Sequence, residues 1–110
     1  MIDLILGLCS ALGKFIVKIW RRVVSFVQNI VGFFKDPHRL ELLKRDKNLI
    51  ATTIRQKLDT GDYKVVSCLF DKETNSVIAT EEGDIQEVES EFLDEQTRRE
   101  FGNKDLLVLK

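Results

Sequence analysis

An apolar surface of unusual width near the start of the chain limits what this sequence can fold into. At about 100° per residue, the polar residues between Asp3 and Phe34 fall within an arc of roughly 120°, and the remaining apolar arc spans about 200°. An ordinary surface helix buries a narrower stripe against its own core. The pattern therefore predicts one long amphipathic helix from Asp3 to Phe34, whose apolar side must be covered by a membrane or by protein.

This predicted helix supplies the candidate binding residues. Those expected to contact a membrane or another copy of the chain are Phe15, Ile16, Ile19, Trp20, Val23, Val24, Phe26, Val27, Ile30, Val31, Phe33 and Phe34. Those expected to contact anionic lipid are Lys14, Lys18, Arg21 and Arg22. Trp and Phe on one face, with Lys and Arg on the other, are typical of a helix that lies in a membrane interface.

A simple membrane span fits this segment less well. A span needs roughly 18 to 20 residues with few charges, and the uncharged runs 4–13 and 23–34 are shorter than that. Four basic residues separate the two runs and would lie near the middle of the bilayer, where charges are costly. A cleaved secretory signal is also disfavoured, because acidic Asp3 precedes the basic residues. We expect the segment to be retained and to lie on a surface.

The rest of the chain predicts an α+β fold. Asp36 and Pro37 are a capping residue and a first helical residue, Gly61 is a stop signal, and the apolar spacing between them predicts a second helix over 37–59. Residues 62–110 predict a β-β-β-α-β module, with strands at 63–70, 76–80, 85–91 and 106–109 and a helix from Asp94 to Phe101. The predicted division is a helix over 1–35 and a small α+β domain over 36–110.

Charge is distributed unevenly along the chain. Residues 1–59 contain 11 Lys and Arg against 5 Asp and Glu, whereas residues 60–110 contain 6 against 13. The basic half suits an anionic membrane, and the acidic half would be repelled by phosphates, so we do not expect nucleic-acid binding. The acidic stretch 81–100 could pair with Lys44, Arg45 and Lys47 or meet a protein partner, and the sequence leaves both open.

Motifs for catalysis or metal binding are missing from the sequence. There is no nucleophile-elbow motif and no phosphate-binding glycine loop, and His38 is the only histidine. Cys9 and Cys68 are far apart in sequence and form no Cys-x-x-Cys pair, so we expect two reduced, apolar-like cysteines. A partial calcium-loop pattern starting at Asp71 has Ser76 in place of the turn glycine and is interpreted as a hairpin. We therefore expect no enzyme activity, no cofactor and no metal.

These observations lead to one functional hypothesis and two alternatives. We expect a non-enzymatic, membrane-associated structural or scaffold protein on the cytoplasmic face of a membrane, attached through the N-terminal helix. Its α+β module would self-associate, most simply as a homo-oligomer, or would recruit a protein partner. The first alternative is a soluble subunit of a larger homo- or hetero-oligomeric assembly or filament, with the helix buried between copies. The second is a small pore-forming or membrane-lytic protein.

Overall fold

A six-stranded mixed sheet forms the centre of the protein in the computed structural model, which describes residues 2–109. The strands are β1 (Ile16–Val24), β2 (Leu49–Lys57), β3 (Tyr63–Asp71), β4 (Ser76–Val77), β5 (Ile85–Leu93) and β6 (Leu106–Leu109). They follow the order β1-β5-β3-β2-β6, and β4 pairs only with β3. The pairing of β1 with β5 is parallel and the other pairings are antiparallel. Thus β1 and β6 are the edge strands at the two ends of this order.

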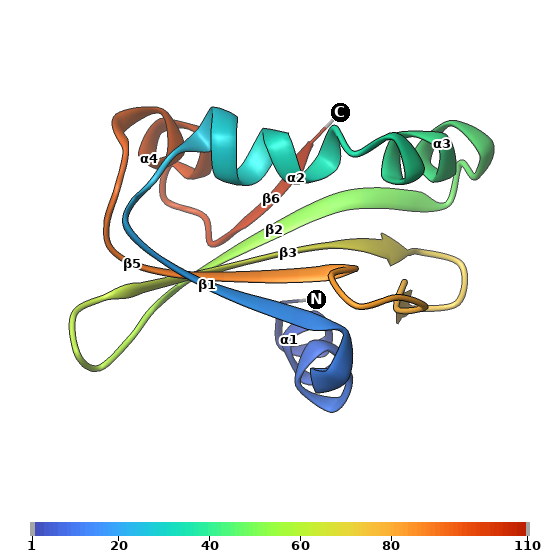
Figure 1. Ribbon diagram of the computed structural model, residues 1–110, viewed down its shortest axis with the longest axis horizontal. Helices are drawn as coiled ribbons and strands as arrows, with labels where there is room; N and C mark the ends of the chain where they lie inside the picture. Colours follow the sequence, from blue (N-terminus) through green and yellow to red (C-terminus); the bar gives the residue numbers. More distant parts are fainter. Residues whose placement is uncertain (1, 110) are drawn as a thin grey trace.

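Helical segments cover the two faces of the sheet unequally. The segments are α1 (Ile2–Ala11), the 3-10 turn η1 (Gly13–Phe15), the π-helical turn η2 (Phe26–Val31), α2 (Gly32–Phe34), α3 (Pro37–Arg45) and α4 (Glu95–Phe101). Figure 1 shows α2, α3 and α4 on one side of the sheet and α1 on the other. We call these sides the helical face and the α1 face.

Two groups of buried side chains correspond to these faces. On the helical face, Ile30, Phe34 and Phe101 belong to a cluster that also includes Val65 and Val88 from the sheet. A second cluster joins residues of α1 to residues of the sheet, and its buried members are Ile5, Cys9, Ile54, Val66, Cys68, Phe70, Val77 and Ile85. The sheet is therefore buried on both faces, with α1 supplying the cover on its own side.

The α+β class and the predicted β-β-β-α-β order of the C-terminal half are confirmed. Asp94 caps α4 by accepting a hydrogen bond from the Thr97 amide, as expected of an N-cap residue. Gly102 follows α4 with a φ of 60°, a conformation that glycine adopts without steric cost. The second strand of this module is shorter than predicted, because β4 contains only Ser76 and Val77.

The prediction of one long helix from Asp3 to Phe34 is wrong. Helix α1 ends at Ala11, residues 16–24 form β1, and helical structure resumes in η2 and α2. Residues 16–24 are rich in Ile and Val, whose branched side chains fit a pleated sheet, and pairing with β5 decides the outcome. The broad apolar arc arises because this segment is buried on more than one side by its own fold.

The prediction of a second helix over 37–59 is also wrong beyond its first half. Asp36 and Pro37 do start a helix, and the Asp36 carboxylate accepts a hydrogen bond from the Arg39 amide. That helix, α3, ends at Arg45, and residues 49–57 form β2. The run Leu49-Ile-Ala-Thr-Thr-Ile54 contains four β-branched residues in the centre of the sheet, so tertiary pairing overrides the helical spacing.

Candidate functional site

The candidate attachment surface surrounds β1, the longer of the two edge strands. Strand β1 runs parallel to β5, with Ile16 opposite Ile85 and Val24 opposite Leu93. Among residues 2–109, β5 is its one neighbour within the sheet. The outer edge of an edge strand presents backbone N–H and C=O groups that can pair with another chain. Alternate residues along the nine-residue strand β1 thus direct their backbone groups outward, where a further strand could pair with them.

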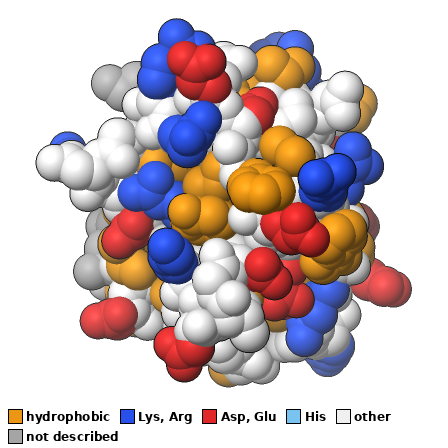
Figure 2. Space-filling model, turned by 90° about the vertical axis from the view of Figure 1, so that its left-hand side faces the viewer, with side chains coloured by type: hydrophobic (Ala, Val, Ile, Leu, Met, Phe, Trp, Pro, Cys, Tyr) orange, Lys and Arg blue, Asp and Glu red, His pale blue; other side chains and the backbone are white. Residues whose placement is uncertain are grey.

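Exposed apolar side chains gather next to this edge. Trp20 on β1 is 59% exposed, and Val23, also on β1, is 41% exposed and lies in register with Phe92 on β5, which is 52% exposed. Val27, in the turn after β1, is 56% exposed. Figure 2 views the end of the molecule where β1 and β5 bend, and it shows apolar side chains at the centre, surrounded by charged ones. We call Trp20, Val23, Val27 and Phe92 the Trp20 patch.

Basic side chains of β1 lie beside acidic side chains of β5. The Lys18 ammonium is 3.9 Å from the Glu87 carboxylate, and the Arg22 guanidinium is 3.9 Å from Glu91. Lys64 on β3 approaches Glu87 at 3.5 Å. Because the Lys18 and Arg22 side chains are each 76% exposed, these pairs contribute little to stability and are easily exchanged for other partners. The basic first half of the sequence therefore meets its acidic second half at this sheet edge.

A hydrogen-bonded carboxylate fixes the end of β1. Asp94 accepts hydrogen bonds from the Phe26 amide, from the Thr97 amide and from the Thr97 hydroxyl, and its own amide donates to the carbonyl of Val24. Burial raises the pKa of this carboxyl, but the hydrogen bonds from Thr97 and Phe26 outweigh it, so the pKa lies below its ordinary value. Asp94 thus fastens the end of β1 and the start of η2 to α4.

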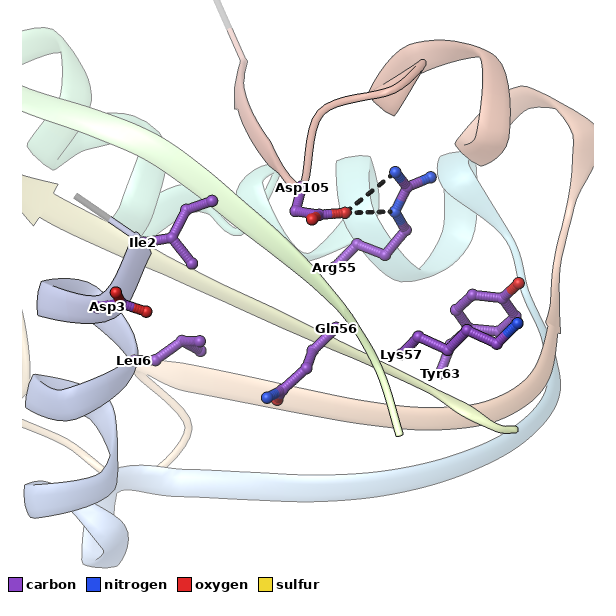
Figure 3. Close-up of a pocket in the computed structure, with 8 residues that line it drawn as sticks. All are labelled: Ile2, Asp3, Leu6, Arg55, Gln56, Lys57, Tyr63 and Asp105. Atoms are coloured by element: carbon purple, nitrogen blue, oxygen red, sulfur yellow. Dashed lines mark hydrogen bonds and ion pairs between the residues drawn. The ribbon is translucent and has the colours of Figure 1, made fainter. Parts of the chain in front are cut away.

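A cavity of about 640 Å³ lies between α1 and the C-terminal end of β2. Most of the charged side chains that line this cavity already contact other groups of the protein. Arg55 bonds Asp105 at 3.1 Å and donates to the Lys104 carbonyl at 2.8 Å, as Figure 3 shows for the Asp105 contact. Lys57 lies 5.8 Å from the centre of the Tyr63 ring. These contacts fix the turn between β2 and β3 and the loop that leads into β6. The side chains that line the cavity do not combine an acid, a base and a nucleophile.

The structure separates the predicted binding residues into three groups. Val24, Phe26, Ile30, Phe33 and Phe34 are buried in the protein's own core, and Phe15, Ile16, Ile19 and Val31 are partly buried against it. Trp20, Val23 and Val27 remain exposed, as do all four predicted lipid-contacting residues: Lys14, Lys18, Arg21 and Arg22. Burial in the core therefore removes most of the apolar surface on which the expected membrane helix depended.

Two features of this region were not predicted. Phe92 joins the Trp20 patch from a strand that otherwise alternates acidic and apolar residues, and only its place in register with Val23 reveals this. The acidic residues of β5 pair with Lys18, Arg22 and Lys64, whereas the sequence left open a pairing with Lys44, Arg45 and Lys47 or with a protein partner. The parallel pairing of β1 with β5 underlies the contacts of Val23, Lys18 and Arg22, and the antiparallel pairing of β3 with β5 underlies that of Lys64.

Residues 2–109 contain no group of three or more His, Cys, Asp or Glu side chains placed to hold a metal ion. Across the same residues, every helix falls short of the length and apolar character that a bilayer crossing requires. The loop from Asp71 forms a turn in which the Asp71 carboxylate accepts hydrogen bonds from the Glu73 and Thr74 amides, consistent with the predicted hairpin.

Comparison with known proteins gives no relative from which a role could be transferred. No protein-family model matches the chain, and neither the curated proteins nor the solved structures yield a match.

Proposed function

We propose that this chain is a non-enzymatic structural subunit that assembles by pairing the β1 edge of one copy with the β1 edge of a second copy. The observation that carries this proposal is the open nine-residue edge of β1 with exposed Trp20 at its middle. Edge strands pair readily with further strands, and exposed Trp is enriched at protein interfaces. Two copies joined in this way would share one continuous sheet.

A twofold axis restricts how two β1 strands can meet. Copies related by such an axis pair antiparallel, and directly opposed residues must point to the same face of the sheet. The axis must therefore lie midway between one residue of β1 and the directly opposed, equivalent residue of the partner. Each choice of central residue defines a different set of opposed side chains, which can be compared by charge.

Charge favours one of these registers. With Ile19 at the centre, Ile19 faces Ile19 of the partner subunit, and Lys18 faces Trp20 of the partner subunit. A cation over an exposed Trp ring contributes about 0.5–1 kcal/mol, and the symmetry provides this contact twice. With Trp20 at the centre, Lys18 would instead face Arg22 of the partner subunit. With Arg21 at the centre, two identical guanidinium groups would oppose each other, which is destabilising.

Measurement of mass in solution tests the proposal. The wild-type protein should form a concentration-dependent dimer in sedimentation equilibrium. Trp20→Arg should yield a monomer, because it places a cation opposite Lys18 of the partner subunit. The fold should persist, since Trp20 is 59% exposed. Leu40→Arg is a matched control on α3, where an exposed apolar residue is also replaced by a cation, and it should leave the dimer intact.

A charge exchange tests the register itself. The double variant Lys18→Glu, Trp20→Arg pairs opposite charges across the axis when Ile19 is central, so dimerisation should recover relative to Trp20→Arg alone. A wild-type protein that remains monomeric at millimolar concentration would contradict the proposal. A dimer that Trp20→Arg leaves unchanged would do the same.

The second candidate is a membrane-associated scaffold on the cytoplasmic face of a membrane, favoured by the exposure of Lys18, Arg21, Arg22 and Trp20 on β1 and of Lys14 in the turn before it. Basic residues near an anionic bilayer contribute about 1 kcal/mol each, and Trp prefers the headgroup region. The acidic side chains of β5 beside this surface would weaken the attraction. Co-sedimentation of wild-type protein with phosphatidylserine vesicles, compared with phosphatidylcholine vesicles, tests this candidate independently of dimerisation.

A further inference from the structure

Two cysteines that are far apart in sequence meet beneath α1. Cys9 lies in α1 and is 4% exposed, and Cys68 lies in the middle of β3 and is 1% exposed. Both belong to the core cluster of the α1 face, and their side chains lie close enough for the Cys68 thiol to shift the pKa of Cys9 by hydrogen bonding. Both are free thiols in this structure. The fold therefore creates a dithiol that spans the interface between a helix and the sheet.

The two thiols have different chemical environments. The hydrogen bond from Cys68 lowers the pKa of Cys9, against the opposing effects of burial and of the Glu87 charge. The same hydrogen bond, together with burial, raises the pKa of Cys68 well above its ordinary value. Since the thiolate is the nucleophile and Cys9, unlike Cys68, lines a cavity at the side of α1, Cys9 is the sulfur that reacts first. Cys68 is placed to react second.

A cavity gives small molecules a route to Cys9. A hollow of about 300 Å³ lies at the side of α1, and Gly7, Cys9 and Ser10 of α1 line it together with Lys64 and Glu87 of the sheet. A side chain at position 7 would meet no atom within 4 Å, so the glycine leaves this approach open. Peroxide is small enough for such a space, whereas large disulfides are not.

We propose that Cys9 and Cys68 are a reversible oxidation site for peroxide, and that a disulfide between them locks α1 onto the sheet. The Cys9 thiolate attacks one peroxide oxygen and breaks the O–O bond, giving a sulfenic acid and releasing hydroxide. The Cys68 thiol then attacks the Cys9 sulfur and loses its proton, and water leaves. In total, two thiols are oxidised and one hydrogen peroxide is reduced to two waters. A thiol reductant reverses the bond.

The consequence for the fold is local. Helix α1 covers the α1 face of the sheet, so the sheet residues beneath it are exposed to solvent only when α1 detaches. The disulfide would close a loop of about sixty residues, which restricts the unfolded chain strongly. We expect the oxidised protein to melt roughly 10 °C above the reduced protein. After reduction of the disulfide, only packing would hold α1 on the sheet.

The test uses the full-length protein treated with hydrogen peroxide under native conditions. Free-thiol titration after denaturation should fall from two thiols to none, and peptide mapping without reductant should recover a Cys9–Cys68 cross-link within one chain. Dithiothreitol should restore both thiols and the lower melting temperature. Cys68→Ala should stop at sulfenic acid or higher oxidation states of Cys9, with no gain in melting temperature.

A second variant probes the route to Cys9. Gly7→Leu should fill the mouth of the cavity and slow cross-linking several-fold, and Ser10→Thr, on the same helix, is the conservative control. The inference would be overturned if the wild-type protein kept both thiols or were oxidised to sulfinic acid without a cross-link. Disulfides found only between chains would also overturn it. Peptide mapping of the wild-type protein decides this even where a variant fails to fold.

Discussion

The two faces of the sheet differ in how completely they are covered. On the helical face, residues from η2, α2, α4 and the sheet share one large cluster, which includes the ends of β1 and β5 at Val24 and Leu93. On the α1 face, one helix covers the part of the sheet near Ile5, while Trp20 and Phe92 remain exposed. The helical face is therefore the more completely buried of the two, while the α1 face and the β1 edge leave apolar side chains exposed.

The largest expected effect comes from truncation on the helical face. Phe101→Ala should lower the free energy of unfolding by about 3–5 kcal/mol, because the Phe101 side chain is 3% exposed within the larger cluster. Urea denaturation measures this loss. A decrease below about 1 kcal/mol would show that the helical face does not dominate stability in the way the contrast implies.

A smaller loss is expected on the α1 face. Ile5→Ala should lower the free energy of unfolding by about 2–3 kcal/mol. This is the lower end of the range for truncating a buried aliphatic side chain, because α1 can shift towards the sheet and partly fill the cavity. The matched control is Leu4→Ala on the same helix, where 44% of the residue is exposed and little change is expected. Equal losses for Ile5→Ala and Phe101→Ala would remove the energetic difference between the faces.

Loss of the Asp94 cap should lower the free energy of unfolding by less than either core truncation, and by an amount that depends on pH. Asp94→Ala should cost about 1–2 kcal/mol at pH 7, because the Thr97 and Phe26 amides lose their acceptor. The folded-state pKa of Asp94 is lowered, so its contribution is present above the unfolded pKa and is lost as pH falls through the folded pKa. The difference between wild type and variant should therefore shrink in acid. A difference that stays constant from neutral pH into the acid range would argue against the assigned protonation state.

The smallest effect on stability is expected at the Trp20 patch. Trp20→Ala should change the free energy of unfolding by less than about 0.5 kcal/mol, since surface substitutions rarely do more. Its effect should appear in association, as a weaker dimer in sedimentation equilibrium. A large loss of thermal stability in dilute solution would mean that Trp20 supports the monomer fold and is not an open binding residue.

Local signals predicted the C-terminal half well. The Asp94 cap, the glycine after α4 and the alternation within β5 are each encoded within a few residues, so the sequence indicates them directly. Asp36 and Pro37 likewise start a helix where expected. Such elements depend on turns and caps, which are properties of neighbouring residues.

The first half depended on distant contacts that the sequence does not display. The Ile and Val residues of 16–24 satisfy the spacing of a helix and of a strand, and pairing with β5, far along the chain, decides between them. The exposure of Lys18, Arg21 and Arg22 could be predicted from their charge. The exposure of Trp20 and the contact of Cys9 with Cys68 could not, because each follows from how the sheet is assembled.

The parallel pairing of β1 with β5 also sets the order in which the chain can fold. Strands β2 and β3 are joined by a short turn and can pair early, whereas β1 must wait for a strand that begins at Ile85. During synthesis, β1 would leave the ribosome well before β5, its neighbour in the sheet. We therefore expect nascent chains truncated before β5 to expose the apolar residues of β1 and to require chaperones until β5 emerges.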